Sequence, residues 1–256
     1  MKQQVKHSAL AALSLVVVVS IGLAGCKSNR AIRTGTEKPA ALDATGRVTG
    51  VVHFKGKAPE RLKIDMAQDP ACSAAGGTNL AEQYVVHNGG LANVYVYVKD
   101  GPPMVNIYVG PIPPPVVLDQ VGCRYVPHVI AVMKGDTVEF RNSDGTMHNI
   151  HTMPAANPGV DVSQGAKGAP EQRRFDTPEV MIPVRCNNHP WMNAFINVSA
   201  TPFFAVTDGD GRFAISGLPP GTYTLAAVHE KLGEQTLRLT VASKAQTTAE
   251  FSYAAK

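Results

Sequence analysis

Soft metal-binding side chains gather in one short run, RCNNHPWM, which spans residues 185–192. It places Cys186, His189 and Met192 at intervals of three residues, and two more imidazoles, His148 and His151, lie upstream in the stretch MHNIH. A thiolate, two imidazoles and a weak axial thioether form a ligand set that suits copper in both of its common oxidation states. The residue types therefore predict a metal site built from the run and one upstream histidine.

Two other interpretations of the run remain open. Zinc is one, although zinc prefers a fourth strong nitrogen, sulfur or oxygen ligand over the thioether of Met192. A structural, buried Cys186 with incidental neighbours is the other. His148 and His151 are three residues apart on a predicted strand, so they point to opposite faces and only one of them can easily be a ligand.

Together with KGDTV at residues 134–138, these motifs resemble amicyanin/plastocyanin-like blue copper proteins, the cupredoxins, over residues 125–199. The resemblance implies a Greek-key β-sandwich with one type 1 copper held by His148, Cys186, His189 and Met192. It also implies that Asn149 hydrogen-bonds the Cys186 sulfur, which leaves His151 at the surface or behind the ligands. Pro183 and the absence of a Gly-x-Tyr-x-Tyr pattern before Cys186 depart from the family.

The elements that must position these residues are predicted to be strands and turns. Gly (23) and Pro (19) are frequent in the 256 residues, which favours an all-β fold with many short strands. A hairpin is predicted with its turn at Lys134-Gly135-Asp136. Residues 154–170 are predicted to be a long surface loop, and residues 111–115 an extended connection. The predicted strands are residues 47–54, 91–99, 129–132, 137–142, 180–185 and 194–198.

Residues 203–251 read as four or five short strands with turns at DGDG and PPG. This tail resembles the carboxypeptidase regulatory-like, transthyretin-like β-sandwich, and GRVTGVV at residues 46–52 is similar to the first strand of that family. The predicted organisation is therefore a copper domain inserted into a second sandwich. Its parts are residues 46–115 (the first part of the second sandwich), 116–200 (the cupredoxin-like domain) and 201–256 (the remainder of the second sandwich).

The N-terminus has the pattern of an export signal. Lys2 and Lys6 precede an apolar stretch, and residues 1–25 end in LAG before Cys26, which resembles a bacterial lipobox. A simple signal anchor or an ordinary cleaved signal is the alternative. We expect a lipid on Cys26, a flexible tether over residues 26–45, and a place in the cell envelope, facing the periplasm or the outer surface.

Cys72 and Cys123 remain after Cys26 and Cys186 are assigned. Because an exported chain meets an oxidising compartment, we predict a disulfide between them. The alternative is that one of the two is a second metal ligand. A lone His128 close behind Cys123 is a lesser candidate for such a second site.

The predicted function is one-electron transfer in the cell envelope, with a cytochrome or dehydrogenase as the redox partner. A copper-binding or delivery lipoprotein and a purely structural β module are the alternatives. No enzyme activity is expected: an oxidase would need further His-x-His clusters to bind additional coppers, and no Ser/His/Asp or paired-carboxylate arrangement stands out. The formal charge of +4 comes without a basic cluster, which argues against nucleic acid. Trp191 is either a docking patch for a partner or a core plug.

Overall fold

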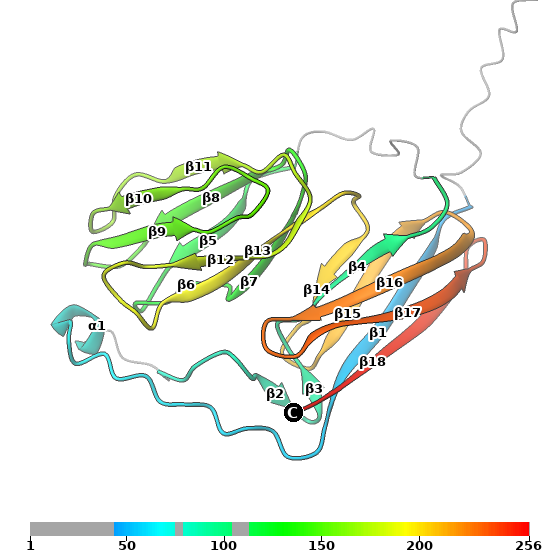
Figure 1. The fold of residues 1–256 in the computed structure, drawn as a ribbon, viewed down its shortest axis with the longest axis horizontal. Helices are drawn as coiled ribbons and strands as arrows, with labels where there is room; N and C mark the ends of the chain where they lie inside the picture. Colours follow the sequence, from blue (N-terminus) through cyan, green and yellow to red (C-terminus); the bar gives the residue numbers. More distant parts are fainter. Residues whose placement is uncertain (1–43, 75–78, 104–112, 256) are drawn as a thin grey trace, which may run out of the picture. The chain divides into compact units, whose positions relative to one another are not determined.

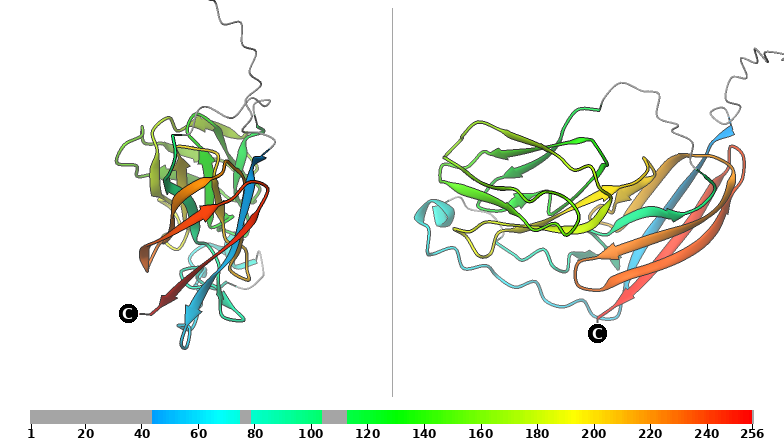
Figure 2. Two further views of the ribbon diagram at one scale, coloured as in Figure 1. Left: turned by 90° about the vertical axis from the view of Figure 1, so that its right-hand side faces the viewer. Right: turned by 45° about the horizontal axis from the view of Figure 1, so that its top comes forward.

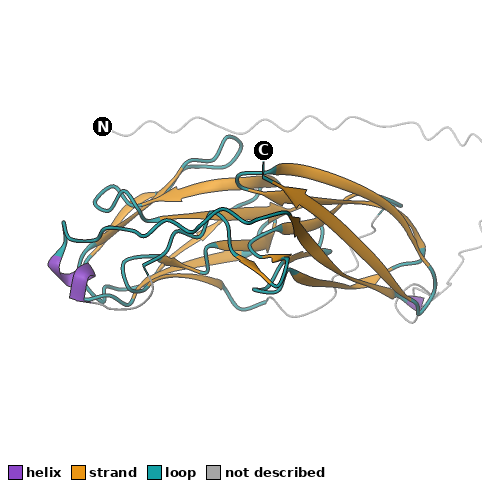
Figure 3. Ribbon diagram, turned by 90° about the horizontal axis from the view of Figure 1, so that it is seen from below, coloured by secondary structure: helices purple, strands orange, loops and turns teal. Residues whose placement is uncertain are grey.

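The protein is built almost entirely of strands, which confirms the all-β prediction (Figure 3). The structure is a computed structural model, and it describes residues 44–74, 79–103 and 113–255. The predicted signal, Cys26, most of the tether and the first residues of the proline-rich connection lie outside the described residues. Within the described residues no helix is long and apolar enough to cross a membrane.

The described residues form eighteen strands and one short helix, α1 (Pro70–Ala74). The strands of the two ends of the chain are β1 (Gly46–Lys55), β2 (Val86–His87), β3 (Gly90–Leu91), β4 (Tyr95–Asp100), β14 (Phe204–Val206), β15 (Arg212–Leu218), β16 (Gly221–His229), β17 (Gly233–Val241) and β18 (Gln246–Ala254). Those of the middle are β5 (Val116–Gln120), β6 (Tyr125–Val126), β7 (Val129–Met133), β8 (Thr137–Asn142), β9 (His148–Thr152), β10 (Asp161–Gln164), β11 (Glu171–Arg174), β12 (Glu179–Arg185) and β13 (Asn193–Ser199).

The middle strands form two sheets, one in the order β10-β9-β12-β13-β7 and the other in the order β11-β8-β5-β6. Figure 1 shows them in green to yellow. Pairing is antiparallel except between β13 and β7 and between β5 and β8. Inward side chains such as Leu118, Phe140 and Ile196 alternate with more exposed ones and fill one core. We call this the first sandwich.

The strands of the two chain ends form the second sandwich. One sheet has the order β15-β1-β3-β2 with β18 also paired to β1, and the other has the order β14-β4-β16-β17. β1 and β18 run parallel and side by side from Arg47 opposite Gln246 to Lys55 opposite Ala254, as Figures 1 and 2 show in blue and red. A separate core, with Val48, Leu225 and Phe251 among its members, fills the space between these sheets. The first and last strands of the described chain therefore belong to the same sheet.

The hairpin predicted around residues 134–136 is wrong. β7 pairs with β13, whereas β8 pairs with β5 and β11 in the other sheet. The turn, with Gly135 at a φ of 84°, therefore carries the chain across the core from one sheet to the other. The local sequence cannot distinguish a hairpin within one sheet from a crossing between two sheets, because the same turn residues connect the strands in both.

Two further elements differ from the sequence prediction. The strand expected over residues 91–99 is split into β3 and β4, because Asn93 adopts a left-handed φ of 62°. The loop expected over residues 154–170 contains β10, which pairs with β9 from Asp161 opposite His151 to Gln164 opposite His148. Gln164 is buried and bonds Gln120 and the Phe140 carbonyl, so the loop is anchored in the core.

Residues 61–74, which we call the cap segment, were predicted to belong to the second sandwich but pack on the first. Met66 and Cys72 are buried in the first core, and Ile64 packs against it. Arg61 holds the segment in place by donating to the carbonyls of Leu80 and Ala81. Apolar burial therefore draws this part of the chain away from the strands that flank it in sequence.

Candidate metal site

The run at residues 185–192 is the loop that closes the β12–β13 hairpin. Arg185 pairs with Asn193 across the base of this loop. The loop is tight because the Met192 N–H donates to the His189 carbonyl at 2.9 Å and the Cys186 N–H donates to the Met192 carbonyl at 3.3 Å. Cys186 and Met192 consequently both face the first core, where they are 4% and 1% exposed.

His148 enters from the neighbouring strand. It is the first residue of β9, which pairs with β12 from Val184 opposite Thr152 to Arg185 opposite His151. The His148 side chain is fully buried, while His151 on the opposite face is only half-buried. Burial lowers the pKa of His148, so that the neutral imidazole required of a metal ligand is favoured.

Three potential donors converge in the interior. Nδ1 of His148 lies 2.9 Å from Nδ1 of His189, and Sγ of Cys186 lies 3.5 Å from the same His189 nitrogen. An ion with metal–nitrogen bonds of about 2 Å can bridge two nitrogens that lie up to about 4 Å apart. The three atoms are therefore close enough to hold a single ion between them.

Both histidines are held by carboxylates through their other ring nitrogen. Nε2 of His148 lies 2.9 Å from Asp144, and Nε2 of His189 lies 2.9 Å from Asp69. A carboxylate accepts only, so in each neutral imidazole the proton resides on Nε2 and the Nδ1 lone pair is free. Two lone pairs facing each other at 2.9 Å repel unless a cation lies between them. This pairing of a carboxylate with the outer nitrogen is the usual support of a metal-bound histidine.

The two carboxylates are themselves fixed by backbone. Asp144 accepts the N–H groups of Gly122 and Cys123 at 2.7 and 2.8 Å. Asp69 accepts the N–H of Ala71 at 2.8 Å and immediately precedes α1. The hydrogen bond from His189 lowers the pKa of Asp69, which keeps this carboxylate ionised.

The donor set fits copper better than zinc. Asp69 and Asp144 already accept hydrogen bonds from the histidines and from backbone, so neither is free to be a fourth strong ligand. Met192 of the same loop is buried and carries a thioether, which is a soft donor. Two other groups of metal-binding side chains among the described residues include Cys72 or Cys123, whose sulfurs are bonded to each other.

Asn149 contacts both ligand segments and hydrogen-bonds the Cys186 sulfur, as predicted. Its backbone N–H, not its side chain, donates to Sγ of Cys186 at 3.3 Å. The side-chain oxygen accepts the Asn187 N–H at 3.4 Å, and the side-chain nitrogen donates to Asp161 at 2.9 Å. His151 lies 2.9 Å from the Asn187 side chain and does not face the donors.

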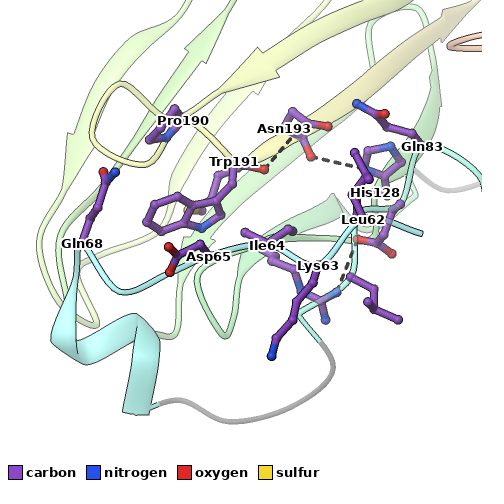
Figure 4. A pocket seen from close by; sticks show the side chains of 15 residues that line it. Leu62, Lys63, Ile64, Asp65, Gln68, Gln83, His128, Pro190, Trp191 and Asn193 are labelled. Carbon is purple, nitrogen blue, oxygen red and sulfur yellow. Dashed lines mark hydrogen bonds and ion pairs between the residues drawn. The ribbon is translucent and has the colours of Figure 1, made fainter. Parts of the chain in front are cut away.

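Trp191 is half-buried and links the ligand loop to the disulfide region. Its indole N–H donates to the Cys123 carbonyl at 3.1 Å, and its ring lies 5.1 Å from the His189 ring. One side of Trp191 borders a cleft of about 450 Å³, and Figure 4 shows the ring between Pro190 of the loop and Asp65 of the cap segment. Trp191 thus packs partly against the first core and partly borders the cleft.

The remaining predicted residues are the cysteine pair Cys72 and Cys123 and the lone His128. Cys72 and Cys123, which are 51 positions apart in sequence, form a disulfide. His128 is buried, but its Nε2 faces Glu230 at 2.6 Å and its Nδ1 faces the Asn193 carbonyl, so it joins no metal-binding group among the described residues.

Sequence reasoning missed Asp69 and Asp144. Asp69 lies 120 residues from His189, and no local pattern indicates the contact. Asp144 precedes His148 by four residues, but this spacing is informative only once the intervening loop geometry is known.

Comparison with known proteins yields one family match. Residues 184–254 match the carboxypeptidase regulatory-like domain. The match includes β14 to β18 of the second sandwich and begins in β12 of the first. A search among curated proteins gave no match.

Several solved structures are similar to part of the chain. A purple cupredoxin from Nitrosopumilus maritimus is 21% identical, covers 33% of this chain and 99% of its own, and has a TM-score of 0.28. The Cu(I) form of a single-site mutant of amicyanin is 18% identical, covers 41% and 98%, and has a TM-score of 0.31. The copper-containing nitrite reductase NirK from Thermus scotoductus SA-01 is 21% identical, covers 54% of this chain and 28% of its own, and has a TM-score of 0.31.

The family match overlaps the tail that resembles the carboxypeptidase regulatory-like domain in the sequence, and cupredoxins are among the solved structures similar to the chain.

Proposed function

We propose that the chain is a one-electron carrier with a single type 1 copper held by His148, Cys186, His189 and Met192. The convergence of Nδ1 of His148, Nδ1 of His189 and Sγ of Cys186, which lie within 4.8 Å of one another, carries this proposal. When bound, copper would accept one electron as Cu(II) and donate it as Cu(I), in a site that suits both oxidation states.

The residues of this chain contribute rigidity and exclusion of water. All four ligands are at most 4% exposed, and the outer nitrogen of each histidine is fixed by a carboxylate. A site that is already ordered rearranges little when its charge changes, which is what electron transfer requires.

We place the protein in the cell envelope, anchored by a lipid on Cys26 and facing the periplasm or the outer surface. The N-terminal pattern supports this place, and the disulfide suits an oxidising compartment. A cytochrome or a dehydrogenase would be the exchange partner.

A second candidate function is copper binding or delivery without electron transfer. It is favoured by the burial of His189, whose outer nitrogen faces Asp69 and not the solvent.

Visible spectroscopy tests the electron-carrier proposal. The full chain in detergent is titrated with Cu(II), and the same is done with Cys186→Ala. An intense thiolate-to-copper band that is lost in the variant, bleached by reductant and restored by oxidant supports the proposal. A band that cannot be cycled favours copper handling, and a colourless protein overturns the type 1 assignment.

A further inference from the structure

The cap segment covers the outer nitrogen of His189. Cys72 of α1 is fully buried, and its Sγ lies 3.7 Å from Nε2 of His189. Asp69 bonds the same nitrogen at 2.9 Å and is further held by the Thr146 hydroxyl at 3.2 Å. His189 is therefore only 4% exposed, and Asp69, which covers it, comes from 120 positions earlier in the chain.

The Cys72–Cys123 disulfide also holds the cap segment against the first sandwich. Cys123 lies in the turn between β5 and β6, where the Gly122 and Cys123 N–H groups bind Asp144, the partner of His148. The disulfide thus joins α1 to the β5–β6 turn, and each of these two segments donates backbone N–H groups to the carboxylate that holds one of the two histidines. The disulfide, the Asp69–His189 contact and the burial of Met66 each hold the cap segment against the first sandwich.

We propose that the cap segment is a closure that controls metal entry and release, with Asp69 as the positioning residue for His189 and the Cys72–Cys123 disulfide as its fastening. The inference rests on the proposed copper site. With the disulfide formed, the cap segment stays against the outer nitrogen of His189 and blocks approach past this histidine, so loading and extraction are slow. Without the disulfide, only the Asp69 contact and local packing keep the cap segment in place.

The first test uses the metal-free full chain in detergent and does not depend on copper. Diethyl pyrocarbonate modifies accessible histidines, and mass spectrometry maps each site. Wild type is compared with Cys72→Ser/Cys123→Ser and with Asp69→Ala, which keeps the disulfide. We expect His189 to react at least tenfold faster in both variants, with His148 still protected.

Internal references and a matched control make this test decisive. His87, whose side chain is 66% exposed, should react alike in all proteins. Asp65→Asn alters a neighbouring carboxylate that bonds the Ala67 N–H, and it should leave His189 protected. Asp69→Asn retains an acceptor oxygen and should restore most of the protection that Asp69→Ala loses. If His148 also becomes reactive in the double serine variant, the first sandwich has unfolded in that variant. The comparison of Asp69→Ala with wild type then decides whether the cap segment protects His189.

The second test measures extraction of Cu(I) from the loaded protein by bicinchoninate. Extraction should be at least tenfold faster from Asp69→Ala and from the double serine variant than from wild type or Asp65→Asn. Equal rates in all four proteins, with His189 equally reactive in wild type and Asp69→Ala, would overturn the closure. A protein that binds no copper refutes the proposed function instead, while the result with metal-free protein still decides on the closure.

Discussion

Removal of the Cys72–Cys123 disulfide should cost the first sandwich about 4 kcal/mol of unfolding free energy. The crosslink joins residues 51 positions apart. In the chain-entropy model, a loop of this length lowers the entropy of the unfolded chain by about 14 cal/mol/K, which is about 4 kcal/mol at 25 °C. The perturbation is Cys72→Ser/Cys123→Ser in the metal-free protein.

Urea denaturation followed by fluorescence measures this loss in the correct sandwich. Trp191 is the only tryptophan and packs against the first core, so its emission reports on that core and not on the second one. Chemically reduced wild type is the matched control and should unfold at the same urea concentration as the variant. A loss below about 1 kcal/mol would refute the reasoning, because the cap segment would then be held almost entirely by packing.

Three further predictions concern other parts of the fold. Gly50→Ala should destabilise the second sandwich by at least about 3 kcal/mol, because a Cβ at this position would lie 1.7 Å from a backbone oxygen of β18. Burial lowers the pKa of His229 to about 4, so the second sandwich should lose up to about 3 kcal/mol as pH falls from about 6.5 to 4. Asn149→Ala should preserve the copper band, because the bond to Cys186 comes from the backbone N–H.

Each of these has its own measurement and control. Gly209→Ala, where an added Cβ meets nothing within 4 Å, is the control for Gly50→Ala and should leave the free energy of unfolding nearly unchanged. Urea denaturation followed by circular dichroism of the tyrosines measures both.

The direction of the pH effect at His229 follows from proton binding. Below about pH 6.5 the unfolded chain binds a proton that the native one does not, so acid favours unfolding. His229→Asn should flatten that slope, and an unchanged slope would contradict the assignment. A lost band in Asn149→Ala would show that the side chain is the essential contact.

The ligand candidates could be predicted from sequence because three of them occupy one loop. Cys186, His189 and Met192 close a single hairpin, so their spacing alone brings them together. His148 lies on the strand paired with that hairpin, and its alternation with His151 separates the buried imidazole from the more exposed one. A local sequence pattern therefore predicts which ligands come together when they lie on one hairpin or on the strand paired with it.

The parts that sequence could not provide depend on contacts between distant segments. Asp69 reaches His189 only because Met66 and Cys72 bury themselves in the first core. The turn at Gly135 was interpreted as a hairpin because nothing near it specifies which sheet receives β8. Strand pairing over long separations is decided by packing of whole sheets, which short patterns do not encode.

Copper X-ray absorption of the loaded full chain shows directly whether Cys186 and two histidines bind the metal. We expect one copper per chain with one short bond to sulfur and two bonds to imidazole nitrogen, and loss of the short sulfur bond in Cys186→Ala. Copper bound only by nitrogen and oxygen, or an environment unchanged by removal of the Cys186 thiol, would contradict it.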